Sequence, residues 1–315
     1  MWRTTNFQFK KLTLVYHSGA LGDFITTLPA IQHLAYQNGP IVMVGKPEYS
    51  KLKKEIFLKV YDCEGRKMTP LFSNGNLDHI DSAFLTTMKQ IGKAILFIRK
   101  GSPIPDNFMK LGLKKIRTFE VFPRMRQPKV LYHLASVGAK SSWTSTPSST
   151  LLIPEKPSKK YHFIERKYVV IAPGSGSYKK NWPLKNYFAI AERLRKDFFC
   201  PVWLLGPAEN GWEKLQELRD EIIISDVSIT EAASIIGTSR LYIGNDSGTT
   251  HLAASVGCPT VALFGPFSDK IVWAPWGKNT VLLSTSENEN SKPTLEDLTI
   301  NKVYKACFEL LSGFL

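Results

Sequence analysis

The feature that most constrains the fold is an alternation of apolar, strand-like segments with amphipathic, helix-like segments, which occurs twice along the chain. In the first half, we expect strands over 11–19, 40–47, 79–84 and 93–100, and helices over 24–37 and 126–140. Buried strands that alternate with helices are typical of a mostly parallel sheet covered by helices on both faces. The first half is therefore predicted to be an α/β domain.

A polar stretch separates the two halves. Residues 141–167 are rich in Ser, Thr, Pro and Lys and have few periodic apolar positions, which is typical of a linker. The alternation then restarts, with strands expected over 167–173, 200–206, 221–225, 240–246 and 258–266, and helices over 184–198, 210–220, 229–239 and 247–257. We predict an N-terminal domain over 1–155, a C-terminal domain over 156–293 and an amphipathic helix over 294–315 that packs back toward the N-terminal domain.

The excess positive charge lies in the first half of the chain. Residues 1–160 contain 25 Lys and Arg against 10 Asp and Glu, a net charge of +15, whereas residues 161–315 have a net charge of −1. Such an asymmetry indicates an acidic partner for the first half, either nucleic acid, anionic lipid or a phosphorylated substrate, or else it only keeps the protein soluble.

The four cysteines and the absence of long apolar runs place the chain in a reducing, aqueous compartment. No two cysteines form a C-x-x-C pair, so buried free thiols are expected. No signal peptide is apparent, and no apolar run reaches the roughly 18 residues that cross a bilayer. We therefore expect a cytoplasmic protein that meets a membrane only at its surface.

The segment "YIGNDSGTTHLAASVGCPTVALFGP" contains the strongest local signal. An expected strand runs into Asp246, and Ser247, Gly248 and Thr249 then open a helix. A helix N-terminus offers unpaired amides and a partial positive charge, so these residue types suit a diphosphate. They equally suit a simple N-cap, and His251, one turn further on, suits either a ligand contact or packing.

A second segment, "APGSGSYKKNWPLKNY", also follows an expected strand. Its small residues, among them Ser175 and Ser177, could cradle a phosphate, and Lys180 could neutralise a departing diphosphate. Pro183 suits the first turn of the next helix. The alternative is a pair of solvated surface lysines, which is the commoner place for lysine.

The segment "HSGALGDFITTLPAIQHL" looks like a phosphate-binding turn with a misplaced carboxylate. Gly19 and Gly22 lack the G-x-G-x-x-G spacing of a dinucleotide loop, which argues against an NAD-dependent dehydrogenase. Asp23 could cap the helix, or it could face the crevice at the carboxyl end of the first strand and act as a general base on a substrate hydroxyl.

In chain order, these three segments resemble those of the glycosyltransferase family 9 heptosyltransferases, with "GPAE" between the second and the last. The resemblance covers most of the chain, and K-x-W-P at 180–183 and the segment from Asn245 to Pro266 are its most specific parts. It implies a GT-B fold, in which two Rossmann-like α/β domains face each other across a cleft. The N-terminal domain would take the acceptor and the C-terminal domain the nucleotide sugar.

The resemblance also implies roles for single residues. Asp23 matches the proposed general base, beside an acceptor-side loop of Ser18, Gly19 and Gly22, and Lys180 matches the lysine that contacts the donor phosphates. The remaining donor-side positions implied by the resemblance or by the phosphate loops are Ser175, Glu209, Asp246, Ser247, Gly248, Thr249 and His251. Glu209 would bind the nucleotide ribose.

The implied reaction is the inverting transfer of heptose from ADP-heptose, expected as ADP-L-glycero-D-manno-heptose, to the anionic inner core of lipopolysaccharide. The resemblance implies no cofactor, a monomer at the cytoplasmic face of the inner membrane and no nucleic-acid partner. No Asp-x-Asp cluster is present, so we expect no metal ion. Alternatives are a GT-B transferase for another nucleotide sugar or acceptor, and a non-catalytic binder of nucleotide sugars or polyanions.

Two positions depart from the family pattern. Many members have Arg shortly before the Gly-Asp pair, where this chain has His17. The segment "GPFSDKIVWAPWG" has Phe267 and Ser268 where the family usually has Thr, at a place that the resemblance puts near the donor.

Overall fold

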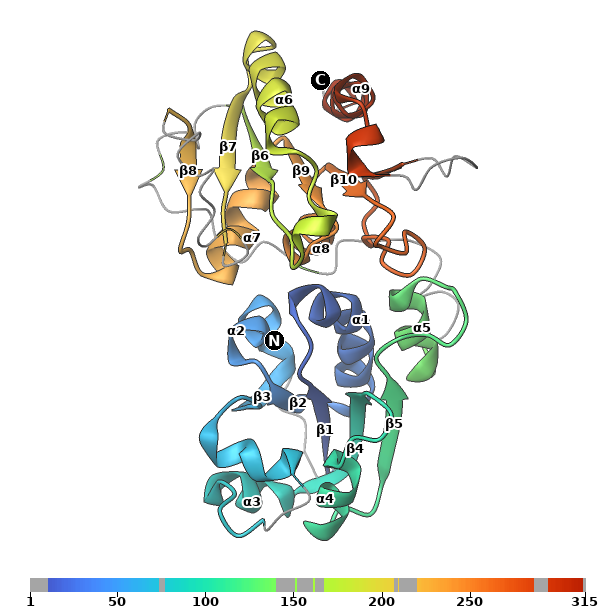
Figure 1. The fold of residues 1–315 in the computed structure, drawn as a ribbon. Coiled ribbons are helices and arrows are strands. Elements are labelled where there is room, and N and C mark those ends of the chain that lie inside the picture. Colours follow the sequence, from blue (N-terminus) through green and yellow to red (C-terminus); the bar gives the residue numbers. More distant parts are fainter. Residues whose placement is uncertain are drawn as a thin grey trace.

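The computed structural model describes residues 11–73, 77–139, 151, 161, 167–206, 209, 220–285 and 294–313. The chain forms two α/β domains that meet at a narrow waist (Figure 1). The predicted boundary at 155/156, most of the expected linker and most of the expected helix over 210–220 lie outside the described residues.

The N-terminal domain has a five-stranded parallel sheet in the order β3-β2-β1-β4-β5. Its strands are β1 (Leu12–His17), β2 (Ile41–Gly45), β3 (Phe57–Asp62), β4 (Ile91–Ile98) and β5 (Ile116–Glu120). Its helices are α1 (Leu21–Asn38), α2 (Pro47–Ser50), α3 (Ser82–Met88), α4 (Ile104–Lys110) and α5 (Lys129–Ser136), with short 3₁₀ helices η1 (Lys51–Ile56) and η2 (Arg66–Phe72).

One expected strand of this domain is wrong. Residues 79–84 do not form a strand, because Asp81 accepts a hydrogen bond from the backbone N–H of Phe84 and caps helix α3. Short apolar runs do not distinguish strand from helix, so the cap decided the structure here. The sequence analysis also missed β3 and β5, two edge strands whose side chains are largely half-buried or exposed.

The C-terminal domain has a six-stranded parallel sheet in the order β11-β10-β9-β6-β7-β8. Its strands are β6 (Tyr168–Ala172), β7 (Cys200–Leu204), β8 (Ile222–Ile224), β9 (Leu241–Asn245), β10 (Thr260–Phe264) and β11 (Thr280–Ser284), of which β11 was not expected. Its helices are α6 (Leu184–Lys196), α7 (Ile229–Thr238), α8 (Gly248–Ser255) and α9 (Ile300–Ser312), with 3₁₀ helices η5 (Tyr178–Lys180) and η8 (Leu295–Asp297).

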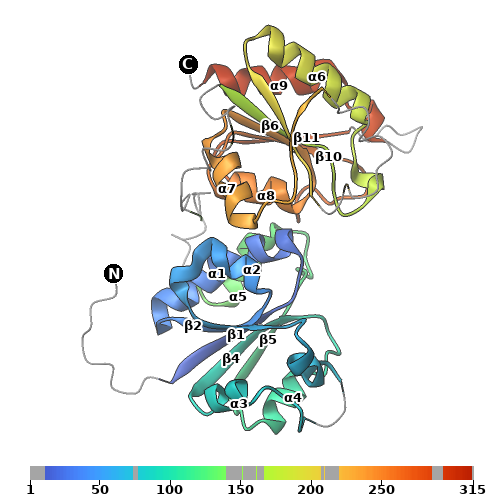
Figure 2. The ribbon, with the colours of Figure 1, turned by 90° about the vertical axis from the view of Figure 1, so that its left-hand side faces the viewer.

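Helix α9 lies in a different place from the one predicted. It packs beside α6 on one face of the C-terminal sheet, far from the N-terminal domain (Figure 2). Val303 and Cys307 of α9 are fully buried and share a cluster with Ile190 of α6 and Val261 of β10. The apolar face of α9 is needed to cover this sheet, so the helix stays with its own domain.

The two domains share a continuous apolar core. Phe24 and Leu28 of α1, Leu252 of α8 and Val256 directly after α8 belong to one buried cluster that reaches both sheets. The N-termini of α1 and α8 meet where the domains touch (Figure 1). The carboxyl ends of both sheets therefore face the same junction.

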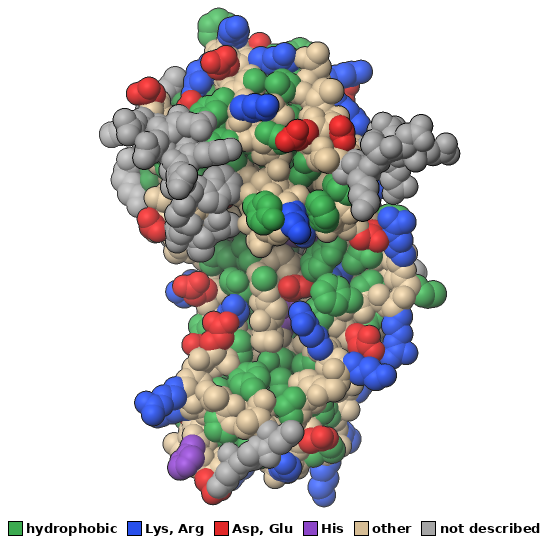
Figure 3. All heavy atoms as spheres, viewed as in Figure 1, with side chains coloured by type: hydrophobic (Ala, Val, Ile, Leu, Met, Phe, Trp, Pro, Cys, Tyr) green, Lys and Arg blue, Asp and Glu red, His purple; other side chains and the backbone are tan. Residues whose placement is uncertain are grey.

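Apolar side chains gather at one level of the surface, and the cysteines are buried as free thiols. In the view of Figure 3, the molecule narrows where the domains meet, and hydrophobic side chains gather at that level. Within the described ranges, no helix has the length and apolar character that a membrane span requires. All four cysteines are free and buried, as expected, and burial raises the pKa of the Cys258 thiol to about 12.

Candidate active site

The three predicted segments converge at the points where the strand order reverses. In the N-terminal sheet, β1 lies between β2 and β4, and in the C-terminal sheet β6 and β9 are neighbours although the strands β7 and β8 lie between them in the chain. Asp23 follows β1, Ser175 follows β6 and Asp246 follows β9. In open α/β sheets, ligands bind at such reversal points beyond the carboxyl ends of the strands.

A cavity of about 480 Å³ lies between the two domains. The predicted residues among its lining are Gly22, Ser175, Glu209, Ser247, Gly248 and Thr249. Its apolar wall includes Tyr49, Val227 and Ile229, which the sequence analysis did not single out. A lining that combines polar groups with apolar side chains suits a ligand with a charged part and a flat apolar part.

Two helix N-termini converge on this cavity. Ser247 accepts a hydrogen bond from the backbone N–H of Thr250 and so caps α8. The capping interpretation is confirmed, and the anion-site interpretation of the same residue stays a prediction. A Cβ added to Gly248 would lie 2.8 Å from Cβ of Leu21 and 3.2 Å from the backbone nitrogen of Gly22, so only glycine lets the helix ends approach this closely. Their partial positive charges add up beside the cavity.

Asp246 is the centre of a compact polar cluster beside this helix end. Its Oδ2 accepts hydrogen bonds from Lys180 Nζ at 2.8 Å and from Ser268 Oγ at 2.5 Å. His251 Nε2 lies 3.9 Å from Oδ1. Burial lowers the pKa of His251 to about 4 although Asp246 opposes that shift, so this imidazole is neutral at pH 7.

The cluster explains one departure from the family pattern. The hydroxyl of Ser268 points at the buried carboxylate of Asp246, so serine supplies the donor at this place. Lys180 is held by Asp246, and its side chain keeps 29% of its surface exposed. Its ammonium is thus positioned beside the α8 N-terminus and remains accessible.

Glu209 is buried at the end of β7. Its Oε2 accepts a hydrogen bond from the backbone N–H of Gly206 at 2.7 Å. A Cβ added to Gly174 would lie 1.6 Å from Oε1 of Glu209, so glycine is required there for the carboxylate to fit. Burial raises the pKa of Glu209, while hydrogen bonds from Gly206 and Gly174 oppose the shift.

Asp23 is both a helix-capping residue and the partner of a buried lysine. Its Oδ2 accepts from the backbone N–H of Ala20 at 3.2 Å, and its Oδ1 accepts from the ammonium of Lys129. Burial raises the pKa of Asp23, but the charge and hydrogen bond of Lys129 outweigh burial, so the pKa lies below its ordinary value. Gly19 lies directly against Asp23, and Ser18 is exposed in the same turn.

Lys129 is the functional candidate that the sequence analysis missed. It lies 106 residues from Asp23 at the start of α5, and only 1% of its surface is exposed. Its ammonium lies 4.4 Å from the ring centre of Trp273 and 5.1 Å from that of Phe122. No local motif marks this lysine, because its role depends on a contact made by the folded chain.

His17 does not supply a cation at the position where many family members have Arg. The side chain is buried at the end of β1 and packs edge-on against Phe24. Burial lowers the pKa of His17 to about 4 against the opposing charge of Asp23. In this chain the positive charge beside Asp23 comes from Lys129 instead.

The loop that contains Asp269 and Trp273 in the C-terminal domain contacts the N-terminal domain beside Lys129. Arg126 Nε pairs with Asp269 Oδ2 at 2.7 Å, and the backbone N–H of Lys129 donates to the carbonyl of Val272 at 3.0 Å. Phe122 packs edge-on against Trp273, with ring centres 5.7 Å apart. The loop therefore joins the domains beside the Asp23–Lys129 pair.

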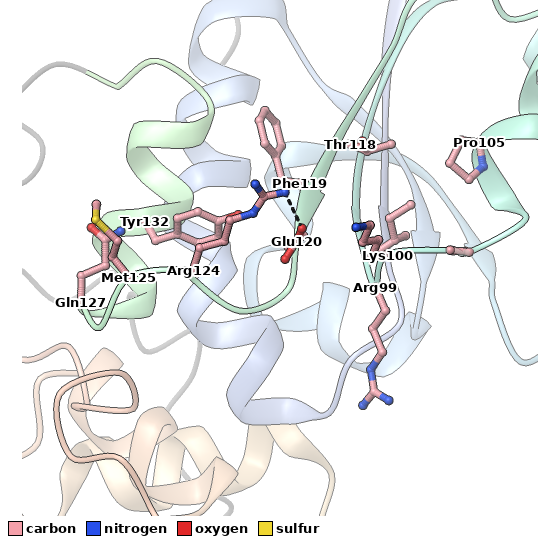
Figure 4. Close-up of a pocket in the computed structure, with 13 residues that line it drawn as sticks. Arg99, Lys100, Pro105, Thr118, Phe119, Glu120, Arg124, Met125, Gln127 and Tyr132 are labelled. Atoms are coloured by element: carbon pink, nitrogen blue, oxygen red, sulfur yellow. Dashed lines mark hydrogen bonds and ion pairs between the residues drawn. The ribbon is translucent and has the colours of Figure 1, made fainter.

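A second cavity, of about 530 Å³, lies wholly within the N-terminal domain. In Figure 4, Tyr132, Met125 and Gln127 lie on one side of it, and Arg99, Lys100 and Pro105 on the other. Arg124 also lines it and pairs with Glu120 at 2.9 Å. Its lining combines the basic side chains of Arg99, Lys100 and Arg124 with the rings of Phe119 and Tyr132.

The described part of the chain contains no group of three or more His, Cys, Asp or Glu side chains placed to hold a metal ion. Asp23 and Asp246 pair with lysines, and Glu209 accepts from a backbone amide. The metal independence expected from the sequence stays a prediction.

Part of the chain is similar in sequence to a curated heptosyltransferase. Lipopolysaccharide heptosyltransferase 3 of Escherichia coli is 26% identical over 148 residues, an alignment that covers 45% of this chain and 43% of that relative. The chain therefore aligns with less than half of that relative's length.

Two solved structures share the fold of both domains. The glycosyl transferase family 9 protein of Veillonella parvula DSM 2008 superposes with a TM-score of 0.77 at 18% identity, covering 96% of this chain and 98% of that one. The E. coli ADP-heptose lps heptosyltransferase II superposes with a TM-score of 0.70 at 18% identity, covering 96% and 99%. The two α/β domains thus form a GT-B fold, as predicted.

A sequence model of one family matches residues 78–305. This range is well over half of the chain, and it contains Lys180, Glu209 and the Asp246 cluster, while Asp23 precedes it. The chain belongs to glycosyltransferase family 9 (heptosyltransferase).

Proposed function

We propose that this protein transfers heptose from ADP-heptose to the anionic inner core of lipopolysaccharide, with inversion at the anomeric carbon. One observation carries the proposal. Gly22 of the N-terminal domain, next to Asp23, and Gly248, at the N-terminus of α8 in the C-terminal domain, line the same cavity. A base from one domain thus lies beside an anion site of the other. That arrangement suits the transfer of a group between two substrates.

The donor would occupy the cavity between the domains. The diphosphate suits the α8 N-terminus, where Ser247, Gly248 and Thr249 line the cavity. Lys180 forms an ion pair with Asp246, and the diphosphate of the nucleotide sugar would form a second contact with the same ammonium. Glu209 would accept from the ribose hydroxyls, and the wall at Val227 and its neighbours suits a base.

The chemical step would break the bond between the anomeric carbon and the ADP oxygen while the acceptor hydroxyl bonds to that carbon. Asp23 would accept the proton of the attacking hydroxyl, a contribution typically of about 10²–10⁴-fold. The bonding electrons leave with ADP. Lys180 and the α8 amides would stabilise the charge that grows on the diphosphate.

The acceptor would lie on the N-terminal domain. The cavity at Arg99 and Lys100 is basic and partly aromatic, which suits a phosphorylated or carboxylated saccharide. Replacing both residues with alanine should raise the acceptor KM and leave the donor KM unchanged.

A net charge of +15 in this half also suits a monomer working at the anionic cytoplasmic face of the inner membrane.

The test is a donor panel of ADP-, UDP- and GDP-sugars followed by calorimetry and turnover. We expect ADP-heptose to bind, Lys180→Ala to weaken that binding, and Asp23→Asn to bind normally but lose about 10²-fold or more in turnover. Near wild-type turnover by Asp23→Asn would contradict the base. Binding without turnover in the wild type would favour the non-catalytic binder, and loss of activity with EDTA would contradict metal independence.

A further inference from the structure

The proposed mechanism assigns no role to the buried ammonium of Lys129, which contacts the proposed base. The Lys129 ammonium is shielded from solvent, contacts Asp23 Oδ1 and is covered by the rings of Trp273 and Phe122. A buried ammonium costs free energy unless it is paired, and a lysine that serves only stability is more readily placed at the surface. Its position against the proposed base therefore needs an explanation.

We propose that Lys129 is a positioning residue for Asp23, which keeps the carboxylate ionised and oriented, and that the C-terminal domain holds Lys129 in place through Trp273 and Val272. This inference rests on the proposed function, since it concerns the base of that reaction. It assigns to Lys129 no contact with either substrate.

Lys129 offsets the electrostatic cost of burying an ionised Asp23. Only 19% of the Asp23 side-chain surface is exposed, and burial by itself favours the protonated carboxyl, which cannot accept a proton. A cation in direct contact reverses that preference. Lys129 thus makes an ionised base compatible with a site from which water is partly excluded.

The other titratable groups around Asp23 do not carry this charge. His17 lies on β1, His133 on α5 and His251 on α8, and burial lowers their pKa values to about 4, 3 and 4, so all three are neutral at pH 7. Burial raises the pKa of Tyr49, on α2, which leaves it neutral too. Among these groups, Lys129 alone is positively charged.

The contacts that hold Lys129 come from the other domain. Its backbone N–H donates to Val272, and the indole of Trp273 faces its ammonium at 4.4 Å. Both groups belong to the C-terminal domain, whereas Asp23 and Lys129 belong to the N-terminal domain. A cation over an indole face is attracted by the ring, the more so when it is desolvated. Contact between the domains therefore fixes the base.

The test is the pH profile of kcat/KM for Lys129→Met, with Lys129→Arg as the conservative variant. Turnover requires ionised Asp23, so the acid limb reports its pKa. Loss of an adjacent cation should move that limb up by about 1–3 pH units, because such a cation typically lowers a carboxyl pKa by that amount. Lys129→Arg should restore much of the wild-type profile, and Lys89→Met, at an exposed lysine, should leave it unchanged.

Trp273→Leu gives a second readout should Lys129→Met fold poorly. It removes the ring that faces the ammonium while both charged residues remain, so it should shift the acid limb in the same direction by less. An unmoved limb in a folded Lys129→Met or in Trp273→Leu, even with lower turnover at the plateau, would overturn the inference. Normal turnover by Asp23→Asn would overturn the proposed base itself, which separates the two failures.

Discussion

At the scale of single residues, small side chains matter most where the two domains meet. Gly22 and Gly248 let the ends of α1 and α8 approach until backbone atoms are nearly in contact. Gly174 does the same for the Glu209 carboxylate. These glycines are required by close approach and not by an unusual backbone angle, since none of them has a positive φ.

Gly248→Ala is therefore expected to destabilise the protein. The added methyl group would lie 2.8 Å from Leu21 Cβ and 3.2 Å from the Gly22 nitrogen, and backbone cannot move aside cheaply. Overpacking of this kind costs about 1–3 kcal/mol. Gly176→Ala is the matched control, because a Cβ there meets nothing within 4 Å. Equal melting temperatures for the two variants would contradict the crowding argument.

The sequence singled out candidate site residues but not how they pair. Asp23, Lys180 and Asp246 are candidates because each follows a strand in a recognisable segment. That Lys180 pairs with Asp246, and that Ser268 donates to the same oxygen, depends on distances across 66 and 22 residues. Such pairings leave no periodic pattern in a sequence.

At the scale of elements, the strands and helices with the clearest periodicity were predicted best. The expected helix over 24–37 is part of α1, and the expected helix over 229–239 is α7, which Ser228 caps. The edge strands β3, β5 and β11 were missed because their side chains are half-buried or exposed and show no uniform apolar run. Burial from both faces makes a central strand recognisable.

The position of α9 can be tested with two substitutions on the same helix. Val303 is fully buried against the C-terminal sheet cluster, whereas 56% of the Phe308 surface is exposed. Val303→Ala should lower the free energy of unfolding by about 1–3 kcal/mol. Phe308→Ala should change it by less than about 0.5 kcal/mol in urea unfolding. A larger loss for Phe308→Ala would contradict this placement of the helix.

At the scale of the whole molecule, burial of histidines at the domain junction makes stability depend on pH. His17, His133 and His251 have folded-state pKa values of about 4, 3 and 4, below the ordinary value of 6.5. Between these values the unfolded chain binds more protons than the folded one. Stability therefore falls as the pH drops from about 6.5 toward 4.

We expect the free energy of unfolding to be clearly lower at pH 5 than at pH 7 in denaturant titrations. Each buried histidine contributes up to about 1.4 kcal/mol per pH unit within its window. Glu209, whose pKa burial raises, acts in the opposite direction and offsets part of the loss. Equal stability at the two pH values would contradict the prediction.

The sequence by itself determined the α/β class and the two-domain division, and it singled out the candidate site residues, because strand periodicity and the residues after each strand are local properties. Only the tertiary structure decided that α9 stays on the C-terminal domain, that η5 brings Lys180 to Asp246, and that Lys129 lies against Asp23. These are contacts between distant segments, selected by which faces must be buried and which charges must be paired once water is excluded.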